Sequence, residues 1–206
     1  YSKLFNQHLM QILYKNILKI TCLTLFINVN YLYAQIKPTS ANERMAGLQK
    51  RKALNEKSVL KNITYTNIGP TQMNGRVVDV EVNPNDPTEF YVAYASGGLF
   101  YTTTNGQSLT SIFDNEDAFS IGDIAVDWSA KTIWVGTGEV NSSRSSYSGT
   151  GVYKSKDNGK NWQYLGLPES HHIGKIILHP TNATIAWVAV LGHLYSPNKE
   201  RGVFKT

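Results

Sequence analysis

The sequence predicts an all-β protein that forms part of a β-propeller, with two complete four-stranded blades and part of a third. Two observations predict this fold: strand-like segments recur at a near-regular spacing, and the composition favours strands and turns. The 206 residues include 16 Gly, 12 Tyr and 4 Trp but only 3 Met. A parallel β-helix and a β-sandwich are the alternatives, and both fit a four-strand period less well.

The first strand of each unit is the clearest repeat. Segments 77–84, 121–128 and 173–180 align without gaps, and each is a mainly apolar run that ends at a turn. Their starts lie 44 and then 52 residues apart, a spacing typical of propeller blades. Because these segments are apolar at most positions, we expect inner strands that are buried on both faces.

The other strands follow in the same order in each unit. Second strands are expected at 89–94, 132–136 and 185–189, third strands at 98–102, 151–155 and 202–206, and fourth strands at 109–113 and 162–165. Blades are therefore expected at about 74–114, 120–167 and 172–206, the last incomplete. A blade cannot bury both faces alone, so the sequence predicts that the remaining blades belong to the same, longer chain.

The N-terminal segment, residues 1–34, has the pattern of a secretory signal peptide. Lys15 and Lys19 precede an apolar run at 20–29, and a small residue, Ala34, ends the segment. The apolar run is too short for a stable membrane span. We expect cleavage after Ala34, with Met10 as an alternative start, and a secreted, periplasmic or cell-surface protein. A buried N-terminal helix is the alternative.

Residues 35–64 have a different composition from the body of the chain. Ala, Leu, Glu, Lys and Arg dominate their centre, which favours a short helix, but apolar positions are few. We expect a solvated and partly helical linker before the propeller at 65–206. A basic arm that binds a partner is the alternative.

The charge distribution argues against a nucleic-acid partner. The chain carries a net charge of +5, but the excess of basic residues lies in residues 1–60, and the remainder has 11 basic and 13 acidic residues. The single cysteine, Cys22, excludes an intramolecular disulfide and any multi-cysteine metal cluster. No phosphate-binding loop and no nucleophile-elbow motif occurs, so no cofactor is expected.

The turn at 155–162 matches the Asp-box pattern Ser/Thr-x-Asp-x-Gly-x-Thr-Trp, except that Asn161 stands where Thr is usual. The expected roles are local: a carboxylate accepts amide hydrogen bonds, a glycine takes a positive φ and an indole packs between sheets. The residues to which these structural roles are assigned are Ser155, Asp157, Gly159 and Trp162. The equivalent turn of the first unit, 102–109, is a degenerate copy.

Further motifs accompany this turn, at 67–77, 95–100, 136–139 and 151–155. Together they resemble exported bacterial propellers with BNR (Asp-box) repeats, which are grouped with the sortilin/VPS10 N-terminal domain, over about residues 65–206. The resemblance implies a multi-bladed propeller. Sortilin-type relatives bind peptides and proteins, and some bacterial members are labelled glycosyl hydrolases. In similar xyloglucan-cleaving propellers a catalytic Asp stands where this chain has Ala95.

The long connection at 139–150 is the best candidate for a ligand site. The first unit makes the equivalent connection with only a few residues, and polar insertions on a rigid scaffold often carry recognition. The residues proposed to bind ligand are Arg76, Glu139, Asn141, Arg144 and Tyr147. The guanidinium of Arg144 suits a carboxylate and the ring of Tyr147 suits a sugar or peptide. The alternative is a flexible Ser-rich loop with Glu139 tied to the sheet.

Two further groups of polar residues favour structural roles. Asp79, Asp123 and Lys175 occupy equivalent positions in the three units, and structural hydrogen bonds suit them better than a role in a central channel. His171 and His172 are adjacent on a strand and point to opposite faces. Since no pair of histidines has a recognised ligand spacing, no metal is expected.

The leading functional hypothesis is an exported binding module for protein, peptide or glycan, with no catalytic residue assigned. The alternative is a glycoside hydrolase of the Asp-box propeller type whose catalytic carboxylates lie partly in other blades. A pair of rim-facing acids at glycosidase spacing would separate the two hypotheses.

Overall fold

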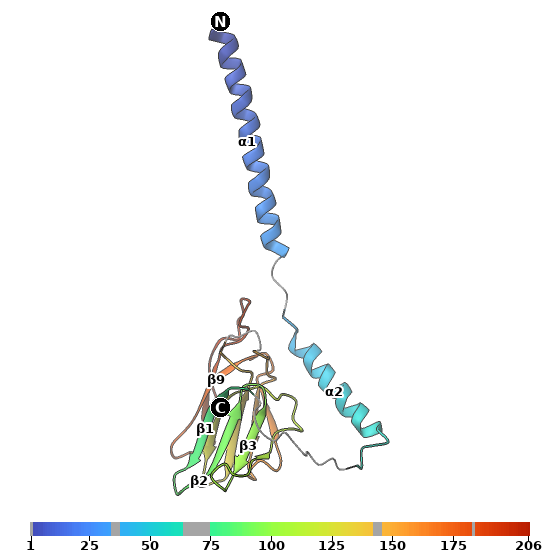
Figure 1. The fold of residues 1–206 in the computed structure, drawn as a ribbon, viewed down its shortest axis with the longest axis vertical. Helices are drawn as coiled ribbons and strands as arrows, with labels where there is room; N and C mark the ends of the chain where they lie inside the picture. Colours follow the sequence, from blue (N-terminus) through green and yellow to red (C-terminus); the bar gives the residue numbers. More distant parts are fainter. Residues whose placement is uncertain (1, 34–37, 64–74, 142–145, 183) are drawn as a thin grey trace. The chain divides into compact units, whose positions relative to one another are not determined.

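The computed structural model describes residues 2–33, 38–63, 75–141, 146–182 and 184–206. The chain divides into two compact units, Tyr1–Pro38 and Thr39–Thr206. In the described residues, the first unit is a single helix, and the second contains a shorter helix and the strands (Figure 1).

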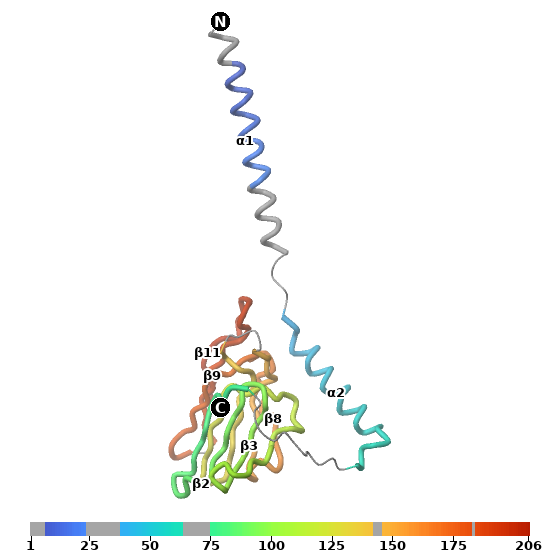
Figure 2. Tube along the Cα trace, in the orientation of Figure 1, coloured from blue at the N-terminus to red at the C-terminus, as the bar shows by residue number. Residues whose placement is uncertain are grey.

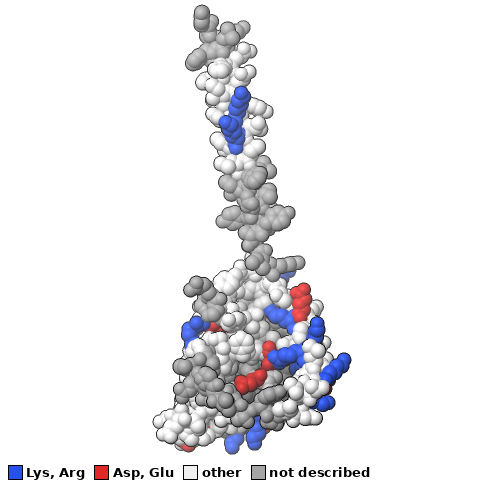
Figure 3. All heavy atoms as spheres, turned by 45° about the vertical axis from the view of Figure 1, so that its right-hand side comes forward, with Lys and Arg blue, Asp and Glu red and all other residues white. Residues whose placement is uncertain are grey.

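The helix of the first unit, α1 (Ser2–Tyr33), is 32 residues long and includes the apolar run at 20–29. Its described charged side chains are basic and gather near the middle of the helix (Figure 3). Among the described residues, no helix combines the length and the apolar character that crossing a membrane requires. The expected cleavage position after Ala34 lies outside the described residues, so the signal peptide stays a prediction.

The second unit begins with α2 (Ala41–Lys57), within the segment that the sequence predicted to be partly helical. Ser40 caps this helix: its hydroxyl accepts a hydrogen bond from the Glu43 amide at 3.3 Å, and the Glu43 carboxylate accepts one from the Ser40 amide at 3.1 Å. This reciprocal capping box satisfies two amides that a helix terminus otherwise leaves without partners, and it fixes the start of α2 at the residue after Ser40.

Three antiparallel sheets form the rest of the unit, and in each the strand order follows the chain (Figure 2). Sheet 1 contains β1 (Val77–Asn83), β2 (Asp86–Tyr94), β3 (Gly98–Thr102) and β4 (Thr110–Ser111). Sheet 2 contains β5 (Ile121–Asp127), β6 (Thr132–Thr137), β7 (Val152–Ser155) and β8 (Gln163–Gly166). Sheet 3 contains β9 (Ile173–Leu178), β10 (Ala186–Val190) and β11 (Gly202–Lys205).

The arrangement of the sheets is that of propeller blades. The inner strands β1, β5 and β9 are neighbours, so each sheet stacks on the next. Every strand pair is antiparallel within the described residues, which rules out parallel β-helix rungs, and three successive sheets do not form a two-layer sandwich. The predicted partial propeller, with two complete four-stranded blades, is confirmed.

Sheet 2 takes part in two hydrophobic cores because its inner strands are buried on both faces. Ile124 of β5 belongs to the core shared with sheet 1, and the next residue, Ala125, belongs to the core shared with sheet 3. Tyr91 and Phe113 fill the first core, and Ile176 and Val188 fill the second. Alternation of side chains along a strand explains why these inner strands are apolar at consecutive positions.

The Asp-box turn connects the two complete blades. Asp157 accepts hydrogen bonds from the Ser155 hydroxyl at 2.8 Å and from the Asn161 amide at 2.9 Å, and Gly159 has a φ of +81°. The Trp162 indole donates to the carbonyl of Ile112 in sheet 1 at 2.8 Å. The turn of one blade therefore anchors to the outer edge of the preceding one. Hydrogen bonds from the side-chain amide of Asn161, its backbone amide and the Ser155 hydroxyl lower the pKa of Asp157 to about 2, so the carboxylate is ionised.

A small apolar cavity marks the equivalent position between sheets 2 and 3. It has a volume of about 210 Å³, and its lining includes Trp134, Leu165 and Phe204. Leu165 occupies the position in sheet 2 that Ile112, the partner of Trp162, occupies in sheet 1. The repeat thus reproduces the slot that holds an aromatic side chain between sheets 1 and 2.

Candidate functional site

The candidate site lies at the edge of the sheets where the inner strands begin. In an antiparallel pair, the start of one strand lies beside the end of the next, as in the pairing of Ile121 with Thr137. Polar and aromatic residues next to these strand ends therefore gather at one edge. We call five of them the rim cluster: Arg76, Phe119, Ser120, Glu139 and Tyr147.

Glu139 is the buried centre of the rim cluster. Its side chain is fully buried, and one carboxylate oxygen forms an ion pair with the Arg76 guanidinium. The other oxygen finds no hydrogen-bond partner within the described residues. The Glu139 carbonyl lies 2.5 Å from Nδ1 of His172, which holds the backbone in place. Glu139 therefore holds the Arg76 side chain, and its burial matches the sequence-based alternative in which Glu139 is tied to the sheet.

Ser120 joins this ion pair to two exposed aromatic rings. Its hydroxyl accepts a hydrogen bond from the Glu139 amide at 3.1 Å and donates one to the carbonyl of Tyr147 at 3.0 Å. The neighbouring Phe119 and Tyr147 rings have centroids 5.5 Å apart, and these residues are 54% and 51% exposed. The Arg76 side chain is 46% exposed, so a guanidinium and an aromatic pair share one rim.

The two remaining predicted ligand residues, Asn141 and Arg144, add little to the description of the candidate site. Asn141 is exposed, and Arg144 lies outside the described residues. Sequence reasoning missed Phe119 because an apolar residue just before an inner strand resembles core, and it missed Ser120 because small polar residues are common at strand ends. The alignment of Ser120 with Arg76, each preceding an inner strand, is the signal that marks both positions.

A second group of contacts fixes the spacing of the inner strands. Asp79 of β1 accepts a hydrogen bond from the Ile124 amide of β5 at 3.3 Å, and Asp123 of β5 accepts one from the Ile176 amide of β9 at 2.7 Å. Lys175 lies 2.8 Å from Asp123 and 3.5 Å from Asp79. The equivalent positions noted in the sequence thus carry the structural hydrogen bonds that the sequence favoured.

The burial of the Asp123 carboxyl group makes stability depend on pH. Burial raises the pKa of Asp123 from 3.8 to about 7, although the hydrogen bond from Lys175 opposes the rise. The folded state therefore binds this proton more tightly than the unfolded state. The contribution of protonated Asp123 to the free energy of unfolding is fully present below about pH 4 and is lost as the pH rises toward 7.

We expect Asp123→Asn to remove this dependence. Urea denaturation of the wild-type chain and of Asp123→Asn between pH 4 and pH 8 tests it. As the pH rises, the wild-type chain should lose stability relative to the variant. Because other carboxylates titrate alike in both proteins, a constant difference across this range would contradict the expectation.

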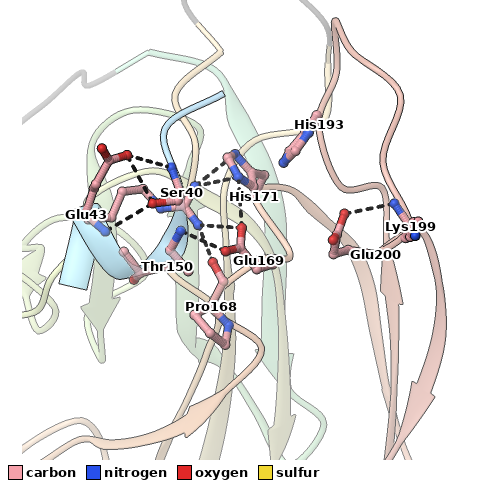
Figure 4. Close-up of polar contacts among 12 residues, drawn as sticks. Ser40, Glu43, Thr150, Pro168, Glu169, His171, His193, Lys199 and Glu200 are labelled. Carbon is pink, nitrogen blue, oxygen red and sulfur yellow. Dashed lines mark hydrogen bonds and ion pairs between the residues drawn. The ribbon is translucent and has the colours of Figure 1, made fainter. Parts of the chain in front are cut away.

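A third group, the histidine cluster, joins α2 to the connection between β8 and β9. Glu169 accepts a hydrogen bond from the Ala41 amide at 2.8 Å, and Arg44 Nη1 lies 2.6 Å from Nε2 of His171 (Figure 4). His193, which follows β10, packs against His171 with ring centroids 4.1 Å apart. Burial and the Arg44 charge lower the pKa of His171 to about 3, so its imidazole is neutral.

These contacts change two expectations from the sequence. The first turn of α2 is not a solvated linker, because Ala41 is buried and Arg44 packs on the blade. Sequence reasoning also compared His171 with His172 and found no shared site. The partner of His171 is His193, which pairing of β9 with β10 brings from 22 residues further along the chain.

Two four-stranded sheets and one three-stranded sheet stack in succession, and the Asp-box turn of sheet 2 contacts sheet 1. This arrangement defines part of a β-propeller of the Asp-box type. No protein-family model matches the chain, and no curated protein matches it. Among solved structures, it is similar to an ancestral GH74 enzyme, with 22% identity and a TM-score of 0.47 over 66% of this chain and 18% of the enzyme.

PorZ and YCF48 are two other proteins whose solved structures are similar to the chain. PorZ, a surface component of the type-IX secretion system of Porphyromonas gingivalis, shares 20% identity, with a TM-score of 0.45 over 63% of this chain and 17% of PorZ. YCF48 bound to a peptide shares 19% identity, with a TM-score of 0.41 over 61% of this chain and 37% of YCF48. The chain thus spans less than a fifth of the first two proteins, and similarity at this level describes the fold alone.

Proposed function

We propose that the propeller is a binding module that recognises a protein or peptide segment at the rim cluster. The observation that carries this proposal is that Glu139 and Ser120 connect the half-exposed Arg76 guanidinium to the backbone of Tyr147, whose half-exposed ring packs on Phe119. Aromatic side chains and arginine supply most of the binding energy at protein interfaces. A ligand segment with an apolar or aromatic side chain next to a carboxylate matches this surface.

The buried Glu139 supports this proposal through preorganisation. An arginine side chain loses conformational freedom when it binds a ligand, and an ion pair that already holds it reduces that loss. Ser120 links the same ion pair to the backbone of Tyr147. The two recognition elements, guanidinium and rings, are therefore held on one hydrogen-bonded frame rather than on independent loops.

We further propose that the module is exported, with residues 1–34 as its signal peptide, and that it is related to the sortilin/VPS10 N-terminal domains. The glycoside hydrolase alternative receives less support from the described carboxylates. A glycosidase needs two substrate-facing carboxyl groups about 5 to 9.5 Å apart. Glu139 is buried against Arg76, and Asp79 and Asp123 hold the inner strands together.

We expect Phe119→Ala and Tyr147→Ala each to weaken ligand binding by about 5- to 30-fold, because each removes a ring worth about 1 to 2 kcal/mol at an interface. A displayed peptide library and a glycan array would first select a ligand. Fluorescence anisotropy with the selected molecule, labelled, then gives the dissociation constants.

Ile177→Ala serves as the control, since it also truncates an exposed apolar side chain, 58% exposed, but on β9 outside the rim cluster. Its affinity should equal that of the wild type. Unchanged affinity in both ring variants would exclude the rim cluster as the binding surface. Selection of glycans alone would replace the proposed peptide ligand with a sugar.

A further inference from the structure

The histidine cluster contains a set of groups suited to a metal ion. A carboxylate oxygen of Glu169 and ring nitrogens of His171 and His193 all lie within 4.8 Å of one another. Figure 4 shows these side chains where the connection between β8 and β9 meets the end of β10. Pairing of Ile173 with Val190 fixes this meeting point, because it places the start of β9 beside the end of β10.

The cluster is currently occupied by the guanidinium of Arg44 from α2. Arg44 Nη1 lies 3.0 Å from Nδ1 and 2.6 Å from Nε2 of His171, and Nη2 lies 3.7 Å from the Glu169 carboxylate and also contacts the Pro168 carbonyl. A cation therefore already stands among the potential ligands. The negative charge of Glu169 and the ring-nitrogen lone pairs of His171 and His193 favour a cation at this position.

Arg44 satisfies this site incompletely. Nε2 of His193 and Nε of Arg44 are both buried, and neither has a hydrogen-bond partner within the part of the chain that the structure describes. A buried nitrogen without a hydrogen-bond partner destabilises the fold, because it has lost its contacts with water and gained none in exchange. His193 is one of the three residues whose potential ligand atoms lie within 4.8 Å of one another, and its Nδ1 already lies 3.1 Å from the Ser196 hydroxyl. A metal ion bound through Nε2 would satisfy the atom that Arg44 leaves unsatisfied.

We propose that Glu169, His171 and His193 form a binding site for a divalent transition metal ion of the zinc type, which binds in place of the Arg44 guanidinium. Two imidazoles and one carboxylate are a known protein ligand set for Zn²⁺. Hard oxygen-seeking ions such as Mg²⁺ and Ca²⁺ do not suit two nitrogen ligands. The site shares no residue with the rim cluster.

Displacement of Arg44 gives the site a consequence for α2. The Arg44 contacts with His171 and Pro168 hold the first turn of the helix on the blade, together with the Ala41 amide bond to Glu169. Metal binding removes the first of these attachments and competes for the Glu169 carboxylate. Zinc binding and docking of the α2 N-terminus are therefore expected to oppose each other.

Isothermal titration of Zn²⁺ into the untagged, chelator-treated chain tests the proposal. We expect one ion per wild-type chain. Arg44→Ala should bind Zn²⁺ at least about 10-fold more tightly because the competing cation is gone, and His193→Ala should bind at least about 10-fold more weakly. Glu169→Gln provides a conservative second variant, since Gln retains an acceptor for the Ala41 amide while it loses the charge.

His179→Ala is the matched control, because His179 lies after β9 in a turn, where its ring accepts hydrogen bonds from Thr181 and Asn182. Its zinc affinity should equal that of the wild type. Failure of the wild-type chain to bind Zn²⁺ would overturn the proposal, as would binding that survives both His193→Ala and Glu169→Gln. Peptide affinity at the rim cluster should be unaffected by His193→Ala, which keeps the two proposals separable.

Discussion

Replacement of Gly122 by alanine is expected to lower the free energy of unfolding by about 3 kcal/mol or more. Gly122 is the second residue of β5. A Cβ atom added there would lie 1.9 Å from the carbonyl oxygen of Ile173 and 2.5 Å from that of Gly138. Both atoms belong to the backbone, so no rotamer change relieves the overlap, and sheets 2 and 3 would have to separate.

Separation of these sheets reaches beyond the site of the substitution. Ile173 and Ile176 fill the core between sheets 2 and 3, and the Ile176 amide is bound by Asp123 from β5. Moving β9 away from β5 loosens that core and lengthens that hydrogen bond together. The expected loss of stability therefore combines overpacking at the carbonyls with lost burial next to them.

Urea denaturation followed by tryptophan fluorescence measures the effect, and Gly47→Ala is the control. Gly47 lies inside α2, where an added Cβ meets no heavy atom within 4 Å. Alanine favours a helix interior over glycine by about 1 kcal/mol, so Gly47→Ala should raise stability or leave it unchanged. Equal midpoints for Gly122→Ala and the wild type would mean that the blades are not spaced as described.

The sequence predicted the blades because each one repeats a local pattern. Alignment of 77–84, 121–128 and 173–180 sets the inner strands, and turn residues set their ends. The same alignment placed Asp79, Asp123 and Lys175 at equivalent positions, which is why a structural role was predictable. The requirement for glycine at position 122 was not predictable, because it comes from close contacts with the backbone carbonyls of Gly138 and Ile173. Such contacts leave no trace in local composition.

The candidate site was predicted less well because its contacts join residues far apart in the chain. Arg76 and Glu139 are 63 positions apart, and Arg44 and His171 are 127 apart. The polar connection after β6 directed the prediction to this edge of the sheets, but the sequence gives no measure of burial. The sequence therefore left open whether Glu139 contacts ligand or is tied to the sheet, and its burial against Arg76 favours the second.

Replacement of Arg76 by methionine is expected to lower the free energy of unfolding by about 3 kcal/mol. Methionine retains the apolar stem but leaves the fully buried Glu139 carboxylate without its cation, and an unpaired buried charge is strongly destabilising. Glu139→Gln removes the charge at similar volume, so the double variant Arg76→Met/Glu139→Gln should recover much of the loss. Urea denaturation of all four proteins gives the coupling between the two side chains.

Arg201→Met is the matched control, because Arg201 is exposed and its guanidinium donates a hydrogen bond to the Leu191 carbonyl at 3.0 Å instead of pairing with a buried carboxylate. If Arg76→Met and Arg201→Met reduced stability equally, the proposed support of Arg76 by Glu139 would be wrong. The double variant then separates fold from recognition. It should remain folded and yet bind the selected peptide more weakly than the wild type, since the rim has kept its rings and lost its guanidinium.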